Sequence, residues 1–190
     1  MVKKTVLGVN KAHFAFYMAQ DFFERGVEAT KELRSPVLKF KEETPWSICF
    51  PICTLAFSLE LALKGFLKDE QIKLLKNKRL GHKFIDIYKL INTEVQTAIE
   101  NHFETCNAHN YYFFNVVYKP SSNELKRPIE TTTREKIINA LERNNEPFVD
   151  FRYFYDLNPQ KEYSFDFSTI IKLIHSCLAV KANELGIELK

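Results

Sequence analysis

A single carboxylate, Glu60, lies in the otherwise apolar stretch from Leu55 to Leu67, which also contains Lys64. Apolar residues cover nearly every helical direction of this stretch, so a helix formed here must be buried. A buried carboxylate must be paired, or it must change its protonation state. Lys64, one helical turn further on, is its only local polar neighbour. Two interpretations stay open: a local Glu60–Lys64 pair at a helix edge, or an inward polar cluster with partners elsewhere in the chain.

Arg152 is the candidate long-range partner, because it is a cation embedded in the aromatic stretch from Phe148 to Asp156. A planar guanidinium can bind a carboxylate through two hydrogen bonds and can stack on aromatic rings. We therefore predict a contact between Glu60 and Arg152. The alternative is a local pair between Arg152 and Asp156, in which the arginine stem only covers apolar surface.

His82 is the histidine best placed for acid–base chemistry. It follows Gly81 at a predicted helix start, with Lys78 and Arg79 just upstream. A helix N-terminus and nearby cations both favour neutral imidazole, the form that can act as a base. The alternative is an ordinary exposed histidine at a junction between loop and helix. His175 lies in an apolar stretch and is expected to be packed or half exposed.

The sequence lacks a phosphate-binding glycine loop, a nucleophile elbow and a metalloprotease helix motif. The spacings Cys49-x-x-x-Cys53 and His102-x-x-x-Cys106-x-x-His109 could each place zinc ligands on one helical face. Structural zinc pairs are more often two residues apart across a tight turn, so we expect no metal and no cofactor. The four cysteines lie in apolar or helical stretches and are expected to stay reduced.

The elements that position these residues are predicted to be helices. The 190 residues contain 45% hydrophobic residues and only five glycines, which favours one domain, 1–190, built as an all-α bundle of about five to seven helices. The most buried helix is expected at 54–67. Its start is open, because Pro45 can begin it while Pro51 could bend or delay it. Helices are predicted at 11–33, 45–67, 70–76, 82–91, 94–108, 132–144, 147–157 and 168–185.

Cap residues and one ambiguous stretch complete this prediction. Residues 111–118 have strand-like composition, but the run is too short to separate strand from helix. In the first predicted helix, one face is formed by residues three or four positions apart: Phe14, Met18, Phe22, Arg25 and Ala29. The predicted caps are Asn10, Asp69, Thr93, the Thr132-x-x-Glu135 capping box, Ser168 and, at the C-terminal end, Gly186.

Charge and hydropathy limit the function classes. The formal net charge of +3 permits contact with nucleic acid but does not demand it. No apolar run reaches the roughly 18 residues that span a membrane, and the first residues lack the apolar region of a secretory signal. We therefore expect a cytoplasmic, soluble protein without a membrane partner.

Three blocks of the sequence together resemble the prokaryotic HEPN domains. They are Ser58-x-Glu60-x-x-x-Lys64, then Gly81-His82, then an aromatic block that contains Arg152 and Tyr153. The resemblance implies a bundle of about five helices, often dimeric, in toxin–antitoxin and phage-defence systems. Many members are metal-independent ribonucleases, and others are noncatalytic partners of nucleotidyltransferases.

The chain departs from the ribonuclease members, which carry an arginine followed four to six residues later by a histidine. No arginine here has a histidine at that distance. The resemblance therefore implies an inward polar set rather than the usual catalytic pair, with His82 and Arg152 as catalytic candidates. The expected ligand-binding residues are Ser58, Glu60, Lys64, Lys78, Arg79 and Tyr153.

Two functional hypotheses follow. The first is a HEPN-like defence or toxin–antitoxin component that binds RNA or a nucleotide, with or without a weak metal-independent ribonuclease activity. The second is a noncatalytic interaction protein that forms a homodimer or binds a larger effector or nucleotidyltransferase. The missing Arg–His spacing favours the second hypothesis for the chemistry, and the resemblance favours the first for the biological setting.

Overall fold

The structure, a computed structural model of the chain, describes residues 11–32, 45–77, 82–106, 115–118, 132–144 and 163–189. In these ranges the chain forms seven helices and one two-stranded ribbon, which confirms the predicted all-α bundle. The elements are α1 (Lys11–Glu32), α2 (Pro45–Lys64), α3 (Asp69–Asn77), α4 (Phe84–Lys89), α5 (Thr93–Thr105), β1 (Asn115–Tyr118), α6 (Thr133–Arg143), β2 (Tyr163–Asp166) and α8 (Phe167–Leu185).

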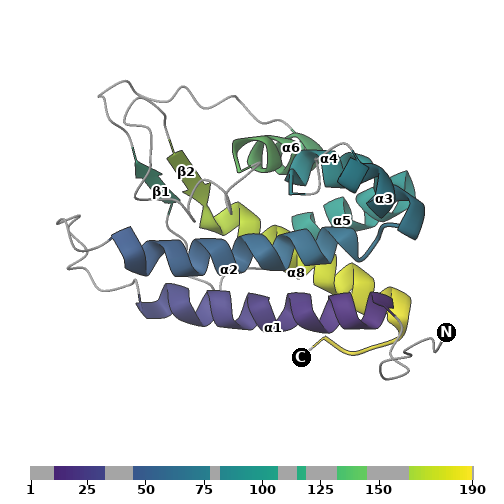
Figure 1. Cartoon of the computed structure of the whole chain (residues 1–190), viewed down its shortest axis with the longest axis horizontal. Coiled ribbons are helices and arrows are strands. Elements are labelled where there is room, and N and C mark those ends of the chain that lie inside the picture. Colours follow the sequence, from purple (N-terminus) through teal and green to yellow (C-terminus); the bar gives the residue numbers. More distant parts are fainter. Residues whose placement is uncertain are drawn as a thin grey trace.

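The long helices α1 and α2 run antiparallel along one side of the molecule, and the shorter helices α3 to α6 gather on the other (Figure 1). Helix α8 packs against α1, α2, α5 and α6, so it joins the two sides. Nine of its residues are buried. An amphipathic helix with such a broad apolar face is typical of the centre of a bundle.

Helix α2 is buried as predicted, since Ile52, Leu55, Leu59 and Leu63 have no exposed surface. It begins at Pro45 and continues through Pro51, so the delayed start is wrong. It ends at Lys64 rather than at residue 67. Beyond that point the backbone N–H groups of residues 66 and 67 donate to carbonyls three residues earlier, which marks a tightened final turn.

The face of α1 that packs in the core is not the face predicted from positions 14, 18, 22, 25 and 29. Phe16, Ala19, Phe23 and Val27 are buried, whereas Phe14 is 61% exposed. Gly26 sits where α1 crosses α2, and a Cβ atom there would lie 2.7 Å from the side chain of Leu55. The glycine therefore permits a close approach of the two helices.

Three predicted helix caps are wrong. Helix α3 begins at Asp69 itself, so Asp69 is not its N-cap, and the caps of α5 and α8 lie one or two residues before the predicted ones. Asn92, rather than Thr93, caps α5, because its side chain accepts a hydrogen bond from the N–H of Glu94. Asp166, rather than Ser168, caps α8 by accepting from a backbone N–H of the first turn. Short polar side chains occur in runs at these boundaries, and the backbone geometry selects the one that caps.

Other predicted boundaries are confirmed. Thr132 and Glu135 form the expected capping box, with both reciprocal hydrogen bonds present. Gly186 ends α8 in the left-handed conformation, with a φ angle of 64°, and Ile187 N–H donates to the carbonyl of Ala182. A residue without a Cβ is favoured at that position.

The strand interpretation of 111–118 is confirmed for residues 115–118. β1 pairs antiparallel with β2, with Asn115 opposite Asp166 and Tyr118 opposite Tyr163. The predicted helix at 147–157, residues 111–114 and the Asn10 cap lie outside the described residues.

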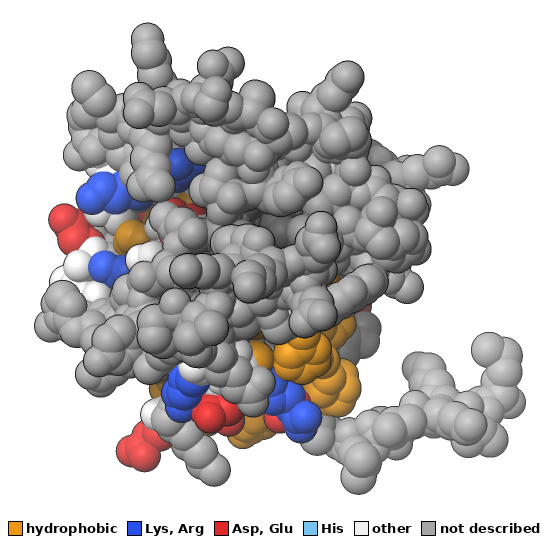
Figure 2. Space-filling view, turned by 90° about the vertical axis from the view of Figure 1, so that its left-hand side faces the viewer, with side chains coloured by type: hydrophobic (Ala, Val, Ile, Leu, Met, Phe, Trp, Pro, Cys, Tyr) orange, Lys and Arg blue, Asp and Glu red, His pale blue; other side chains and the backbone are white. Residues whose placement is uncertain are grey.

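The described side chains at the end of the bundle where α1 finishes and α2 starts include both charge signs (Figure 2). Among the described side chains on this face, basic and acidic groups stand next to one another beside an apolar patch (Figure 2). None of the helices in the described ranges combines the length and apolarity that crossing a bilayer requires.

Candidate functional site

Glu60 is the centre of a polar cluster in the predicted place. Its side chain is only 7% exposed, and its two carboxylate oxygens have different partners. Lys64 Nζ donates to Oε1 at 2.7 Å, and His82 Nδ1 lies 2.9 Å from Oε2. The local Glu60–Lys64 pair is confirmed, and so is an inward cluster with a partner elsewhere in the chain. We call Glu60, Lys64 and His82 the Glu60 cluster.

His82 approaches the cluster from a turn rather than from a helix. The predicted helix at 82–91 is shorter, because α4 begins at Phe84 and Lys83 precedes it without a side-chain cap bond. An ionised carboxylate can only accept hydrogen bonds, so Nδ1 of His82 must be the donor to Glu60. In neutral His82 this leaves Nε2 with the lone pair. The imidazole side chain is 64% exposed, so it is accessible to a ligand in solvent.

Ser58 lies on α2 two residues before Glu60 and faces α1 rather than His82, so it plays a structural part. It has no exposed surface, and its hydroxyl donates to the carbonyl of Ala19 at 2.7 Å. This bond ties α2 to α1. A ligand-binding role for Ser58 stays a prediction.

Four residues of the predicted site lie outside the described ranges: Lys78, Arg79, Arg152 and Tyr153. The proposed contact between Glu60 and Arg152 therefore stays a prediction. What the described residues establish is that Glu60 already has two hydrogen-bond partners, one from its own helix and one from the turn before α4.

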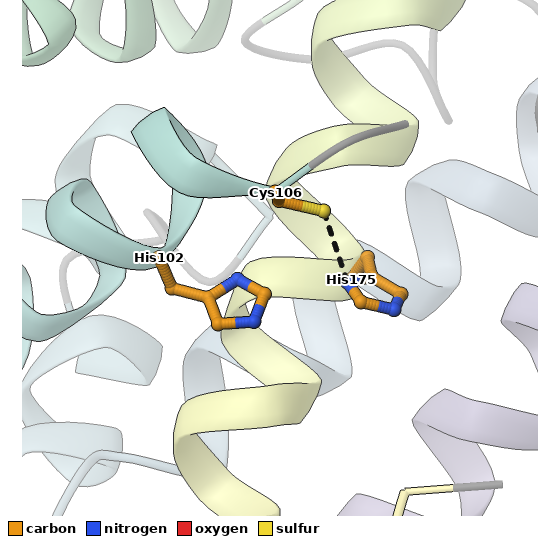
Figure 3. A group of neighbouring side chains, drawn as sticks. All are labelled: His102, Cys106 and His175. Carbon is orange, nitrogen blue, oxygen red and sulfur yellow. Dashed lines mark hydrogen bonds between the residues drawn. The ribbon is translucent and has the colours of Figure 1, made fainter. Parts of the chain in front are cut away.

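A second cluster joins α5 to α8 and contains His102, Cys106 and His175. Each offers one potential ligand atom, and these atoms all lie within 4.8 Å of one another. Cys106 Sγ lies 3.4 Å from His175 Nδ1. The His102 and His175 rings are 5.5 Å apart and tilted by 35°. Figure 3 shows the three side chains converging, with Cys106 above the space between the two rings.

Local structure explains why α5 can present two of these groups together. His102 is in the last turn of α5, and Cys106 is its C-cap, whose N–H donates to the carbonyl of His102. Side chains four residues apart lie on the same side of a helix. His175 comes from the middle of α8, which packs along α5.

Burial controls the protonation of this second cluster. It lowers the pKa of His102, and the neighbouring Lys172 ammonium lowers it further. It also lowers the pKa of His175, with His102 adding to the effect. Burial raises the pKa of the Cys106 thiol, and Lys172 offsets part of that rise. The histidines therefore favour the neutral form and the cysteine favours the thiol, which is the less nucleophilic form.

Sequence reasoning identified His102 and Cys106 as a pair with ligand spacing, but it combined them with His109 and missed His175. His109 lies outside the described residues. The Cys49–Cys53 pair on α2 is not part of this group. Burial, with a contribution from Cys53, raises the pKa of Cys49 to about 11. All four cysteines lie in the described ranges, and each is a thiol rather than half of a disulfide.

The two clusters permit different chemistry. The Glu60 cluster combines an oriented, exposed imidazole with a buried carboxylate, which suits proton transfer. The second cluster combines one sulfur and two histidine nitrogens, which suits a borderline-soft metal ion. The chain matches no protein-family model, no curated protein and no solved structure.

Proposed function

We propose that the chain is a HEPN-like component of a prokaryotic defence or toxin–antitoxin type system that binds RNA or a nucleotide at the Glu60 cluster. The observation that supports this proposal is an exposed imidazole held by a buried carboxylate. Such a pair fixes the tautomer and orientation of the histidine, as the carboxylate does in hydrolase triads. A purely structural ion pair would not require an accessible ring.

A metal-independent cleavage of RNA is the reaction that this geometry would serve. His82 Nε2 would accept the proton of a ribose 2′-hydroxyl, and the 2′-oxygen would attack the adjacent phosphorus. The bond from phosphorus to the 5′-oxygen would break, and the leaving oxygen would take a proton from water or from a cationic side chain. Glu60 would stabilise the imidazolium that forms. Arg152, Lys78 and Arg79 are the proposed cations for the phosphate.

Lys64 offsets the negative charge of Glu60 in the cluster. It pairs with Glu60 through the oxygen that His82 does not use, and its side chain is 24% exposed. A lysine in this position donates a hydrogen bond to the carboxylate and adds positive charge near the entering phosphate. The cluster as a whole then carries no excess negative charge that would repel RNA.

The test is incubation of the purified protein with single-stranded RNA in EDTA. His82→Ala should lose cleavage, and Glu60→Gln should reduce it by about 10- to 1,000-fold, since a general base contributes about 10²- to 10⁴-fold. The matched control is Glu28→Gln, which removes an exposed carboxylate that pairs with Lys31 on α1. Circular dichroism of every variant in the same EDTA buffer checks that the fold persists.

Cleavage that survives His82→Ala unchanged would exclude His82 as the base, and strict dependence on divalent metal would exclude the mechanism. RNA binding should be measured separately by fluorescence anisotropy. Binding that is retained by an inactive parent protein would leave the recognition part of the proposal in place and would remove the nuclease part.

A second candidate function is a noncatalytic protein that forms a homodimer. Phe14 and Tyr17 favour it, because they are 61% and 51% exposed and lie three residues apart on α1. Adjacent exposed aromatic side chains are typical of protein interfaces. Light scattering should then give a dimer mass that falls to the monomer mass in Phe14→Ser/Tyr17→Ser. A monomeric parent at all accessible concentrations would rule out this dimer.

A further inference from the structure

We propose that His102, Cys106 and His175 form a zinc-binding site between α5 and α8. This site is separate from the Glu60 cluster and does not depend on the function proposed for it. It replaces the expectation, drawn from the sequence, that the chain binds no metal. The three residues supply one sulfur and two nitrogen ligands, and the fourth position of the ion is left to water or to another group.

The distances favour a tetrahedral ion. Zinc bonds of about 2.0–2.1 Å to nitrogen and about 2.3 Å to sulfur place tetrahedral ligand atoms about 3.3–3.6 Å apart. Cys106 Sγ and His175 Nδ1 are already 3.4 Å apart. All three ligand atoms lie within 4.8 Å of one another, so the widest gap needs to close by about an ångström. Side-chain rotation can supply that change, because all three residues are half-buried rather than locked in the core.

Ser176 gives an independent reason to assign this site. Its hydroxyl donates to the carbonyl of Lys172 at 2.8 Å, so its oxygen is available to accept. His102 Nδ1 lies 3.2 Å from that oxygen and is therefore the protonated nitrogen. This leaves Nε2 of His102 with the lone pair that a metal requires. Metal-binding histidines characteristically donate their other N–H to such a partner, which fixes the tautomer and the ring.

The three ligand residues lie on two helices, α5 and α8, that pack against each other in the bundle. His175 lies on α8, with its ring 6.3 Å from that of Phe23 on α1. His102 and Cys106 close the C-terminal end of α5. An ion bound here would cross-link two helices through ligands that are about 70 residues apart in sequence, so it would bind the folded state more tightly than the unfolded chain.

The choice of zinc follows from the ligand types. One thiolate with two imidazoles suits a borderline-soft ion and excludes calcium and magnesium, which require oxygen ligands. Copper also binds such sets, so a protein that binds Cu²⁺ but not Zn²⁺ is the competing outcome of the test. Because a thiolate must form, binding releases the Cys106 proton to solvent.

Cobalt is the spectroscopic probe. The metal-free reduced protein, titrated with Co²⁺, should develop a sulfur-to-cobalt charge-transfer band and tetrahedral d–d bands that saturate at one ion per chain. Zn²⁺ should abolish these bands by displacement, whereas Mg²⁺ and Ca²⁺ should not. Cys106→Ala should remove the charge-transfer band, and His102→Ala or His175→Ala should weaken binding. The matched control, Cys53→Ala on α2, should keep the full spectrum.

Ser176→Ala tests whether Ser176 orients the His102 ring for metal binding or only supports the fold. It should keep the charge-transfer band, because the sulfur ligand remains, but it should raise the dissociation constant about 10- to 100-fold. An unchanged dissociation constant would overturn the role assigned to Ser176. A weakly absorbing, octahedral cobalt spectrum, or binding of copper alone, would overturn the zinc site.

A measurement on the unmodified protein removes the risk that a variant fails to fold. Zinc should slow the alkylation of Cys106 by at least tenfold and leave that of Cys53 unchanged, as read by peptide mass after digestion. Cys106 and Cys53 are both half-buried, so Cys53 is an internal reference. Equal alkylation of Cys106 with and without zinc would overturn the proposal.

Discussion

Replacing Glu60 by glutamine tests the buried cluster at its centre. The amide keeps the size of the carboxylate but offers a single acceptor oxygen to two donors, Lys64 and His82. The two donors bind different oxygens of Glu60, so one donor loses its partner, and the remaining bond loses the negative charge of its acceptor. The amide NH₂ group also faces a donor in place of an acceptor.

The magnitude follows from the exposure of the partners. A hydrogen bond to a charged group contributes about 1.5–3 kcal/mol when it is shielded from water. The Lys64 side chain is 24% exposed and keeps most of that value, about 1.5 kcal/mol, whereas His82, at 64%, keeps only about 0.5 kcal/mol. Glu60→Gln should therefore lower the free energy of unfolding by about 2 kcal/mol, and the melting temperature by about 4–8 °C.

Urea unfolding followed by circular dichroism measures this free energy, and an unchanged denaturant slope confirms that the native fold is the same. The matched control is Glu28→Gln, because Glu28 pairs with Lys31 on α1 but is 67% exposed. That change should cost less than about 0.5 kcal/mol. Lys64→Met combined with Glu60→Gln should cost less than the sum of the two single changes. Equal stability of Glu60→Gln and Glu28→Gln would refute the buried-cluster reasoning.

Three further predictions concern single bonds. Ser58→Ala removes the buried bond to α1 and should lower the free energy of unfolding by about 1 kcal/mol in urea; no loss would contradict the structural role of this hydroxyl. Asp166→Ala should lower the free energy of unfolding by about 1 kcal/mol, seen as a lower melting temperature, and Ser168→Ala should not. The reverse result would restore Ser168 as the cap. Burial and the Glu100 carboxylate raise the pKa of Tyr88 in the folded protein above its usual value of 10.0. As the pH rises, the Tyr88 hydroxyl therefore loses its proton in the unfolded chain before it does so in the folded protein. Stability should therefore be full below pH 10 and fall as the pH rises above it, and Tyr88→Phe should show a shallower decline in alkaline urea titrations; equal slopes would contradict the assignment.

Local signals in the sequence predicted the helices well. The Thr132–Glu135 capping box was predicted and is confirmed, because both of its hydrogen bonds form within one helical turn. The same holds for the Glu60–Lys64 pair. The caps at Asn92 and Asp166 were missed, since neighbouring polar residues of similar propensity compete and only the backbone conformation distinguishes them.

Long-range contacts could not be predicted in the same way. Residues 115–118 could be assigned to a strand only once β2, more than 40 residues later, was known to pair with them. His175 looked like an isolated histidine in an apolar helix, and nothing in its local sequence indicates that α8 brings it to Cys106. His82 and Glu60 were named as one polar set, but the turn before α4 that joins them carries no periodic signal.

The position of α8 along the chain has a consequence for synthesis in the cell. This helix follows every other described element, yet it covers the apolar faces of α1, α2, α5 and α6. About 40 residues separate the end of α6 from the end of α8, which takes a ribosome about 2–8 s at roughly 5–20 residues per second. During that interval the emerging chain presents an open apolar groove that chaperones can bind and neighbouring chains can enter. The core can therefore close only after α8 has been synthesised and can pack against these helices.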